Sequence, residues 1–133
     1  MVPWIVGSLL AGLGNALILS WQRRAREQYG RKIFCFLGQD CDAVVLSQYG
    51  TTLGMPNERL WVYYYIAAFI LLALHTLADS YFALGLLAFC AFTAVMFSGY
   101  LLVVQAAILK QYCSWYIAAT GIHVLLLSFI LLL

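Results

Sequence analysis

Four cysteines are the side chains of this 133-residue chain that could carry redox or metal chemistry. Cys35 and Cys41 lie six positions apart in the segment CFLGQDCDAVVLSQYGTTLGMPNE, which is polar while almost all of the remaining chain is apolar. Cys113 precedes the last apolar run. Cys90 lies inside an apolar run, where we expect it to pack as a small core residue. The chemistry open to the chain depends on which of these thiols the fold brings together.

The elements that must position the thiols are membrane helices. Only 9% of the residues are charged and 65% are hydrophobic, whereas a soluble domain carries about 25% charged residues. A segment needs about 20 apolar residues to cross the bilayer, and its backbone must pair internally in lipid, which requires a helix. We therefore predict an all-α integral membrane protein, a single domain over residues 1–133, with a four-transmembrane-helix bundle. The predicted spans are residues 3–21, 60–77, 81–109 and 113–133.

A long loop, residues 22–59, connects the first two spans. Its start, WQRRAREQYGRK, continues the first helix, and we expect its charges to lie at the level of the lipid headgroups. The segment DAVVLSQYG is too short to span and predicts a half-helix, with Asp40 or Asp42 near its positive N-terminal end. The sequence GMPN predicts a turn before the second span.

Four spans place both termini on one side of the membrane and the loop on the other. Cys113, at the start of the fourth span, then lies on the same face as Cys35 and Cys41. Cys90 lies roughly 28 Å from that face along its helix, at about 1.5 Å per residue. Three thiols are therefore expected to gather at one face, and Cys90 is not.

Three kinds of chemistry fit such a cluster. A disulfide between Cys35 and Cys41 would fix the loop in an oxidising compartment, and thiol–disulfide exchange would pass oxidation between this pair and Cys113. A metal site is the weakest alternative, because there is no Cys-x-x-Cys pair. His75 and His123 lie at or beyond the middle of their spans, where we expect hydrogen bonds to a neighbouring helix. The spacing alone favours the structural disulfide and leaves exchange open.

The motifs of the loop and of the helix that follows it resemble those of one family. The chain is similar to the vitamin K epoxide reductase family, including its bacterial disulfide-forming relatives, over nearly its whole length. The resemblance rests on these residues: Cys35, Cys41-Asp42, Val44-Val45-Leu46-Ser47, Tyr49-Gly50, Gly54-Met55-Pro56-Asn57, Tyr63-Tyr64-Tyr65, and Cys113 at the start of the fourth span.

The resemblance implies an enzyme, a quinone-linked thiol–disulfide oxidoreductase of the membrane. The cofactor is a quinone of the ubiquinone, menaquinone or vitamin K type, bound inside the four helices near the loop face. Cys113 matches the first cysteine of the family's Cys-x-x-Cys motif, and Cys41 matches the loop cysteine that exchanges with it. Cys35 matches the outer loop cysteine, which meets a thioredoxin-like redox partner.

The resemblance also implies a set of quinone-binding residues. Asn57 matches an asparagine whose amide donates a hydrogen bond to a quinone carbonyl, a strong orienting contact in a dry pocket. The alternative for Asn57 is a turn or cap residue ahead of the second span. The other pocket residues, for which ordinary helix packing is the alternative, are Val44, Val45, Leu60, Tyr64, Tyr65 and Tyr116.

One position departs from the family in a way that affects the chemistry. The motif reads Cys113-Ser-Trp-Tyr116, so a tyrosine replaces the second cysteine. A phenol, with a pKa of about 10, forms no disulfide. Trp61, where a glycine is often found, adds further bulk, and we expect the pocket to be narrowed or filled. Four interpretations follow: Cys41 and Cys113 act as a two-cysteine shuttle, a thiol of a partner replaces the missing cysteine, the chain is a non-catalytic subunit of a larger membrane complex, or Tyr116 is an engineered substitution.

The charges and the resemblance disagree about orientation. The loop side carries every basic residue of the chain: Arg23, Arg24, Arg26, Arg31, Lys32, Arg59 and Lys110. The positive-inside rule would place this side in the cytoplasm. The resemblance places the loop on the exoplasmic side, in a periplasm or the ER lumen, where disulfides persist, and we follow the resemblance. The basic residues form no extended face for nucleic acid.

Overall fold

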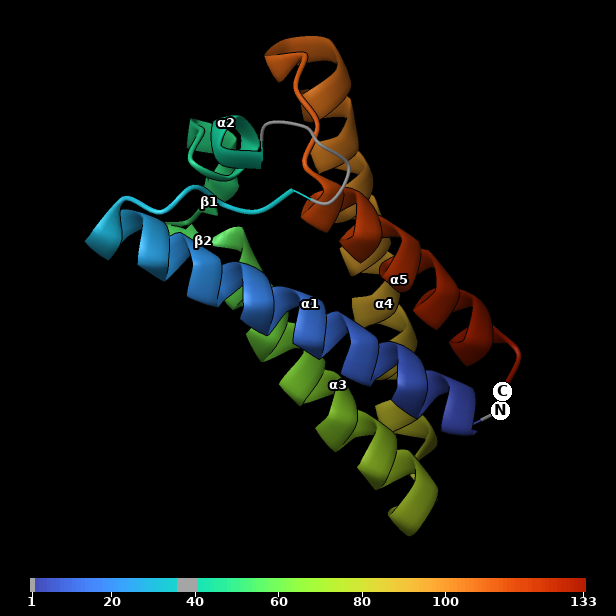
Figure 1. Cartoon of the computed structure of the whole chain (residues 1–133). Helices are drawn as coiled ribbons and strands as arrows, with labels where there is room; N and C mark the ends of the chain where they lie inside the picture. Colours follow the sequence, from blue (N-terminus) through green and yellow to red (C-terminus); the bar gives the residue numbers. More distant parts are fainter. Residues whose placement is uncertain (1, 36–40) are drawn as a thin grey trace.

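The computed structural model describes residues 2–35 and 41–133, so that Asp40 of the predicted half-helix lies outside the described residues. In this part of the chain four helices are long and apolar enough to cross a membrane (Figure 1). They are α1 (Val2–Tyr29), α3 (Asn57–Ala78), α4 (Tyr81–Val103) with its continuation η2 (Val104–Leu109), and α5 (Ser114–Leu131). The predicted all-α membrane fold is confirmed.

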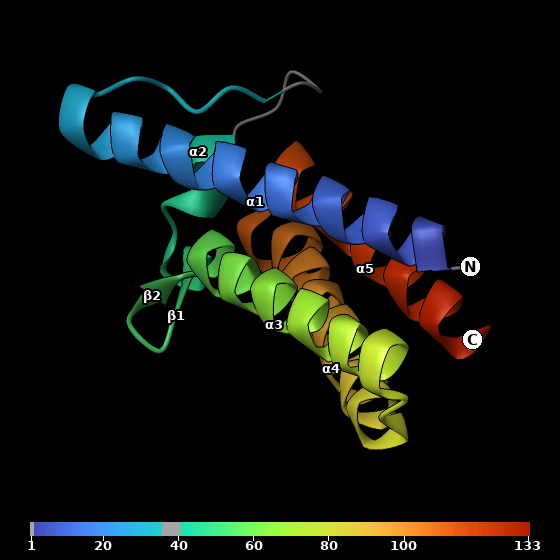
Figure 2. The same cartoon turned by 90° about the horizontal axis from the view of Figure 1, so that it is seen from below.

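The four helices pack in a ring. α1 lies against α3 and α5, and α4 lies against the same two helices on their other side. Residues that face the centre, such as Leu9, Leu87 and Leu126, are fully buried, whereas apolar side chains on the outer faces remain exposed, as at Leu10 and Phe89. An apolar outer surface of this kind suits a lipid environment. The ends of α1 and α5 marked N and C lie together in both views (Figures 1 and 2).

The loop face begins where α1 ends, eight residues beyond the predicted span. Gly30 has a φ of 71°, and its N–H bonds to the Arg26 carbonyl at 3.0 Å, a typical helix C-terminus. The chain then runs back along α1 as an extended segment that ends at Cys35 (Figures 1 and 2). The charged continuation of the first helix is thus confirmed.

The predicted half-helix is present as two shorter pieces, α2 (Cys41–Val45) and a 3₁₀ turn, η1 (Gln48–Gly50). Ser47 separates them, because its hydroxyl donates to the Val44 carbonyl at 2.7 Å and accepts the Tyr49 N–H at 3.2 Å. This use of the serine side chain competes with a continuous helix.

The chain turns at Leu53–Gly54 in a small hairpin, earlier than the predicted GMPN turn, whose Met55 and Pro56 lie in a strand. β1 (Thr51–Thr52) pairs antiparallel with β2 (Met55–Pro56). Leu53 and Gly54 connect the strands with φ values of 56° and 79°, as a two-residue hairpin turn requires. β2 leads directly into α3.

His123 joins three helices at the middle of the bundle. Its Nε2 bonds to the Tyr65 hydroxyl of α3 at 2.6 Å, and its Nδ1 bonds to the Ser98 hydroxyl of α4 at 2.5 Å. Gly12 of α1 makes room for this junction, since a Cβ there would lie 2.4 Å from the Tyr65 ring. The expected hydrogen bonds of His123 to neighbouring helices are confirmed. His75 bonds to the Ser80 carbonyl at 3.3 Å, just before α4 begins.

Candidate functional site

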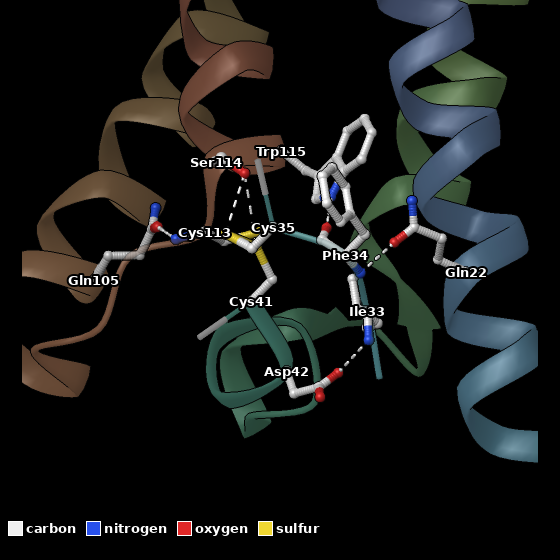
Figure 3. The surroundings of a disulfide bond; sticks show 10 residues. All are labelled: Gln22, Ile33, Phe34, Cys35, Cys41, Asp42, Gln105, Cys113, Ser114 and Trp115. Atoms are coloured by element: carbon white, nitrogen blue, oxygen red, sulfur yellow. Dashed lines mark hydrogen bonds between the residues drawn. A yellow bond between two sulfur atoms is a disulfide. The ribbon is translucent and has the colours of Figure 1, made fainter. Parts of the chain in front are cut away.

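The site is built around a disulfide between Cys35 and Cys41, whose Cα atoms are 5.7 Å apart (Figure 3). Cys41 is the first residue of α2 and is fully buried. Cys35 ends the extended segment and is half-buried. The bond therefore joins a fixed, dry sulfur to one that lies nearer the surface.

Three helices hold the extended segment in place. The Ile33 N–H donates to Asp42 Oδ1 of α2 at 3.1 Å, and the Phe34 N–H donates to Gln22 Oε1 of α1 at 2.7 Å. The Trp115 indole N–H of α5 donates to the Phe34 carbonyl at 2.5 Å (Figure 3). Cys35 is the next residue, so its position is set by bonds to α1, α2 and α5 together. The predicted place of Asp42 in the first turn of the short helix is confirmed.

Cys113 and Ser114 bring the start of α5 to the same disulfide. The Ser114 Oγ lies 3.2 Å from Cys35 Sγ and 3.7 Å from Cys41 Sγ. Cys113 is a free, fully buried thiol and is the residue before Ser114. Neighbouring Cα atoms are about 3.8 Å apart, so Cys113 lies one residue away from a side chain that touches both sulfurs.

Gln105 fixes the backbone of Cys113. Its side-chain oxygen accepts the Cys113 N–H at 2.7 Å, and its amide nitrogen donates to the Leu101 carbonyl at 3.2 Å. Gln105 lies in η2, a π-helical turn, and is itself buried. π-helical turns are frequent at functional sites, and this one anchors the chain just before the fourth span.

Burial decides the protonation of Cys113. Removal from water raises the pKa of its thiol to about 11, while the backbone amides of Tyr116 and Trp115 act weakly in the opposite direction. At pH 7 about one molecule in 10⁴ then carries the thiolate. Since the thiolate is the nucleophile in exchange, the protonated Cys113 thiol is a weak nucleophile in this arrangement.

A buried ion pair holds the part of the loop around α2 and η1 against α1 and α3. Arg23 of α1 contacts Glu58 of α3 through Nε, and the two side chains are 9% and 0% exposed. Arg23 Nη2 also donates to the Val45 carbonyl at 2.7 Å and to the Gly50 carbonyl at 3.0 Å. We refer to Arg23, Glu58 and these two carbonyls as the arginine anchor.

The arginine anchor corrects one prediction. The charge run after the first span was expected to act as a simple interfacial anchor, and Arg23 does not, because its guanidinium is buried in the protein and paired with Glu58. Glu58 supplies the physical reason, since a buried carboxylate requires a partner. Gly50 completes the arrangement: a Cβ there would lie 1.9 Å from the Val45 carbonyl oxygen, so only glycine lets both carbonyls reach Arg23.

Asn57 connects the hairpin to the loop. Its Oδ1 accepts the Thr52 hydroxyl at 2.7 Å, and its Nδ2 donates to the Tyr49 carbonyl at 2.8 Å. This is the turn-residue alternative expected from the sequence.

Four of the other predicted pocket residues, Val44, Val45, Tyr65 and Tyr116, are packed inside the protein. Val44 and Val45 are buried in α2, and Tyr65 is bonded to His123. Tyr116 is buried against Trp61, with ring centroids 5.1 Å apart in an edge-to-face arrangement. The two rings that were expected to narrow or fill the pocket therefore pack on each other, and whether they close a quinone site stays a prediction.

A cavity of about 360 Å³ lies between α3 and α4. Of the residues predicted to bind the quinone, Leu60 and Tyr64 line it, and Trp61 forms the part of its wall that packs against Tyr116. Cys90 also lines it and is half-buried, so this thiol borders a cavity, whereas we expected a core position. The remaining lining residues are Thr52, Phe89, Thr93, Ala94 and Phe97.

Comparison with known families gives one result. The sequence model of the vitamin K epoxide reductase family matches residues 3–131, nearly the whole chain. Among curated proteins and among solved structures, no significant match is found. Within residues 2–35 and 41–133, no group of three or more histidine, cysteine or acidic side chains could hold a metal ion.

Proposed function

Because the chain belongs to the vitamin K epoxide reductase family, whose members are oxidoreductases, we propose that it is a membrane thiol–disulfide oxidoreductase coupled to a quinone. The observation that carries the proposal is the contact of Ser114 with both sulfurs of the Cys35–Cys41 disulfide. Because Cys113 directly precedes Ser114 in the chain, this contact places the free, buried thiol of Cys113 near the Cys35–Cys41 pair.

The proposed cycle uses three cysteines in place of the family's four. A dithiol partner of the thioredoxin type reduces the Cys35–Cys41 disulfide, becomes a disulfide itself and leaves both loop thiols reduced. The thiols of Cys41 and Cys113 then give two electrons and two protons to the quinone and form a Cys41–Cys113 disulfide. Finally, the Cys35 thiolate attacks Cys41, the Cys41–Cys113 bond breaks and Cys113 leaves as a thiolate that takes up a proton. The sum is one partner dithiol oxidised and one quinone reduced.

The half-buried position of Cys35 supports its role as the partner's contact. Phe34, the preceding residue, is 64% exposed and offers an apolar side chain beside the disulfide. A partner that approaches this edge meets Cys35 before Cys41, which is fully buried.

A disulfide-trapping experiment tests the exchange. In the Cys35→Ser variant, we expect mild oxidation to produce a Cys41–Cys113 disulfide, detected by mass mapping of the intact chain. Cys90 is the internal control, because it lies on α4 among the residues that line the α3–α4 cavity and should remain free. If Cys113 stays reduced while Cys41 is oxidised by other reagents, the proposed exchange is wrong.

The quinone is proposed to enter from the cavity between α3 and α4. Its volume of about 360 Å³ falls in the usual range for small-molecule sites, and Leu60 and Tyr64 line it. We expect Leu60→Trp, which fills the cavity, to lower the rate of short-chain quinone reduction while leaving the Cys41–Cys113 trap intact. The matched control is Ile70→Trp on the exposed side of the same helix. Equal rates in both variants would rule out this entry route.

The loop is proposed to face the exoplasmic side, in a periplasm or the ER lumen. The proximity of Cys35 and Cys41, whose Cα atoms are 5.7 Å apart, supports this, since a disulfide formed by such a pair persists in oxidising compartments. A Lys32→Cys variant, made at an exposed loop position, should react with a membrane-impermeant thiol reagent added to intact cells. Labelling only after the cells are broken would place the loop in the cytoplasm.

A second function is favoured by a specific observation. The buried contact of Trp61 with Tyr116 occupies space beside the position where the family's second cysteine would stand. A non-catalytic subunit of a larger membrane complex would tolerate this. Purification in mild detergent distinguishes the two: a lone chain that turns over quinone excludes the subunit, whereas a stoichiometric partner protein without turnover supports it.

A further inference from the structure

The Ser114 hydroxyl lies between the two sulfurs of the disulfide, closer to Cys35 (3.2 Å) than to Cys41 (3.7 Å). Ser114 is 1% exposed and begins α5. A serine hydroxyl has a single hydrogen to donate, so it can serve one sulfur at a time. The distances make Cys35 the nearer acceptor.

The surroundings make such a donor important when the disulfide is broken. Burial favours the neutral thiol over the thiolate, and Cys35 is half-buried beside the fully buried Cys41 and Cys113. A disulfide sulfur accepts hydrogen bonds weakly, whereas a thiolate is a charged acceptor and accepts them strongly. The contact from Ser114 therefore strengthens as charge develops on sulfur, and an interaction of this kind accelerates a reaction.

We propose that the Ser114 hydroxyl is a catalytic group that stabilises the Cys35 thiolate during thiol–disulfide exchange. In the forward step the Cys35 thiolate attacks Cys41 and releases Cys113. In the reverse step the Cys113 thiolate attacks Cys41, and Cys35 leaves as the thiolate. Ser114 donates to the same atom in both directions, as microscopic reversibility requires. The inference rests on the proposed exchange.

Two acidic side chains near the site, both among the described residues, are paired with arginines. Asp42 of α2 accepts the Ile33 N–H and lies 3.8 Å from the Arg26 guanidinium of α1. Glu58 of α3 is paired with Arg23. Replacement of Ser114 touches neither pair. A change in the pH dependence of Cys35 between variants can therefore be assigned to the hydroxyl.

The test measures alkylation of Cys35 against pH in the full chain after complete chemical reduction, with each cysteine resolved by mass. In Ser114→Ala, we expect the midpoint of the Cys35 profile to rise by about one to two pH units. The rate at pH 7 should fall about 10- to 100-fold, as expected when a hydrogen bond to a charged group is lost. Ser114→Thr keeps a hydroxyl and should restore the profile. Ser128→Ala removes an exposed serine from the same helix and should change nothing.

The outcomes separate this inference from the proposed function. An unchanged Cys35 profile in Ser114→Ala overturns the role of the hydroxyl, even if the Cys41–Cys113 disulfide still forms in Cys35→Ser. A shifted profile together with no Cys41–Cys113 disulfide supports the contact and contradicts the exchange. A shift of equal size in Ser114→Thr would mean that packing, and not the hydroxyl, controls Cys35, and would also overturn the proposal.

Discussion

Two attachments hold the loop to the helices, and they differ in kind. The sulfur cluster, defined as Cys35, Cys41, Cys113 and Ser114, joins the extended segment and the start of α2 to α5 (Figure 3). The arginine anchor joins the end of α2 and the 3₁₀ turn to α1 and α3. The first uses a bond that can be exchanged, and the second uses fixed charges. In the proposed exchange, the loop changes its sulfur pairing while the arginine anchor holds it on the bundle.

α2 is the element that connects these two attachments. Its first residue, Cys41, belongs to the sulfur cluster, and its last residue, Val45, is bonded to Arg23. At about 1.5 Å per residue, the two ends are roughly 6 Å apart. In the proposed exchange, a helix held at its C-terminal end would keep Cys41 in place when Cys35 is released.

The largest expected effect is the loss of the arginine anchor. Arg23→Met leaves Glu58 buried without its counter-charge, and we expect the free energy of unfolding to fall by about 3–5 kcal/mol. Arg24→Met, at the exposed neighbouring position, should change it by about 0.5 kcal/mol or less. Thermal unfolding in detergent measures both. If the double variant Arg23→Met with Glu58→Met is no more stable than Arg23→Met alone, the account of a stranded charge is wrong.

The second effect concerns the pH dependence of the sulfur cluster. The thiol of Cys113, with a pKa raised to about 11 by burial, should be alkylated about 100-fold faster at pH 9 than at pH 7, a difference of about 2.7 kcal/mol. Because the folded state holds this proton more tightly, the associated stability is complete below the unfolded thiol's pKa of about 8.5 and is lost as the pH rises towards 11. Mass-resolved alkylation in folded and denatured chains tests this, and a folded-state rate that levels off below pH 9 contradicts it.

The disulfide should contribute less stability than the arginine anchor. It closes a loop with a sequence separation of 6, for which chain entropy predicts about 2 kcal/mol. Cys35→Ser should lower stability by about this amount and leave the region near Arg23 protected from hydrogen exchange. Cys90→Ala, at a half-buried thiol outside the cluster, is the control. Loss of protection at Val45 and Gly50 in Cys35→Ser would show that the two attachments are not independent.

The smallest effect is expected at the middle of the bundle. Tyr65→Phe removes the hydroxyl that bonds to His123 and should cost about 1 kcal/mol. Tyr63→Phe, at an exposed position of the same helix, should cost less. Neither variant should alter the formation of the Cys41–Cys113 disulfide when it is combined with Cys35→Ser. Altered trapping in Tyr65→Phe would indicate that the helix junction and the sulfur cluster are coupled.

The sequence predicted the elements better than the contacts between them. Hydropathy identifies the four spans because about 20 apolar residues have few alternatives to a membrane helix. The continuation of α1 to Tyr29 and the short helix at Cys41 were also predicted. Two features of the loop were missed, the hairpin at Thr51–Pro56 and the break at Ser47, because both depend on single side-chain and glycine contacts.

The arginine anchor shows why the rest could not be predicted. Arg23 and Glu58 are 35 positions apart, and a charge run after a membrane span is normally found at the headgroups. Glu58, an acid at the start of α3, was the available signal, since a carboxylate among apolar residues requires a partner. Ser114 was missed for a related reason: its role depends on distances to Cys35 and Cys41, which lie more than seventy positions away along the chain.

The position of Cys113 depends on the number of residues in the π-helical turn η2. A π-helical turn holds one residue more than the α-helical turn it replaces, so the residues after it are offset from the helix that carries them. Deletion of one residue within Val104–Leu109 would restore ordinary winding and rotate the following segment by about 100°. Gln105 would then no longer meet the backbone of Cys113. Gln105, eight positions before Cys113, thus ties the position of the last sulfur to the winding of η2.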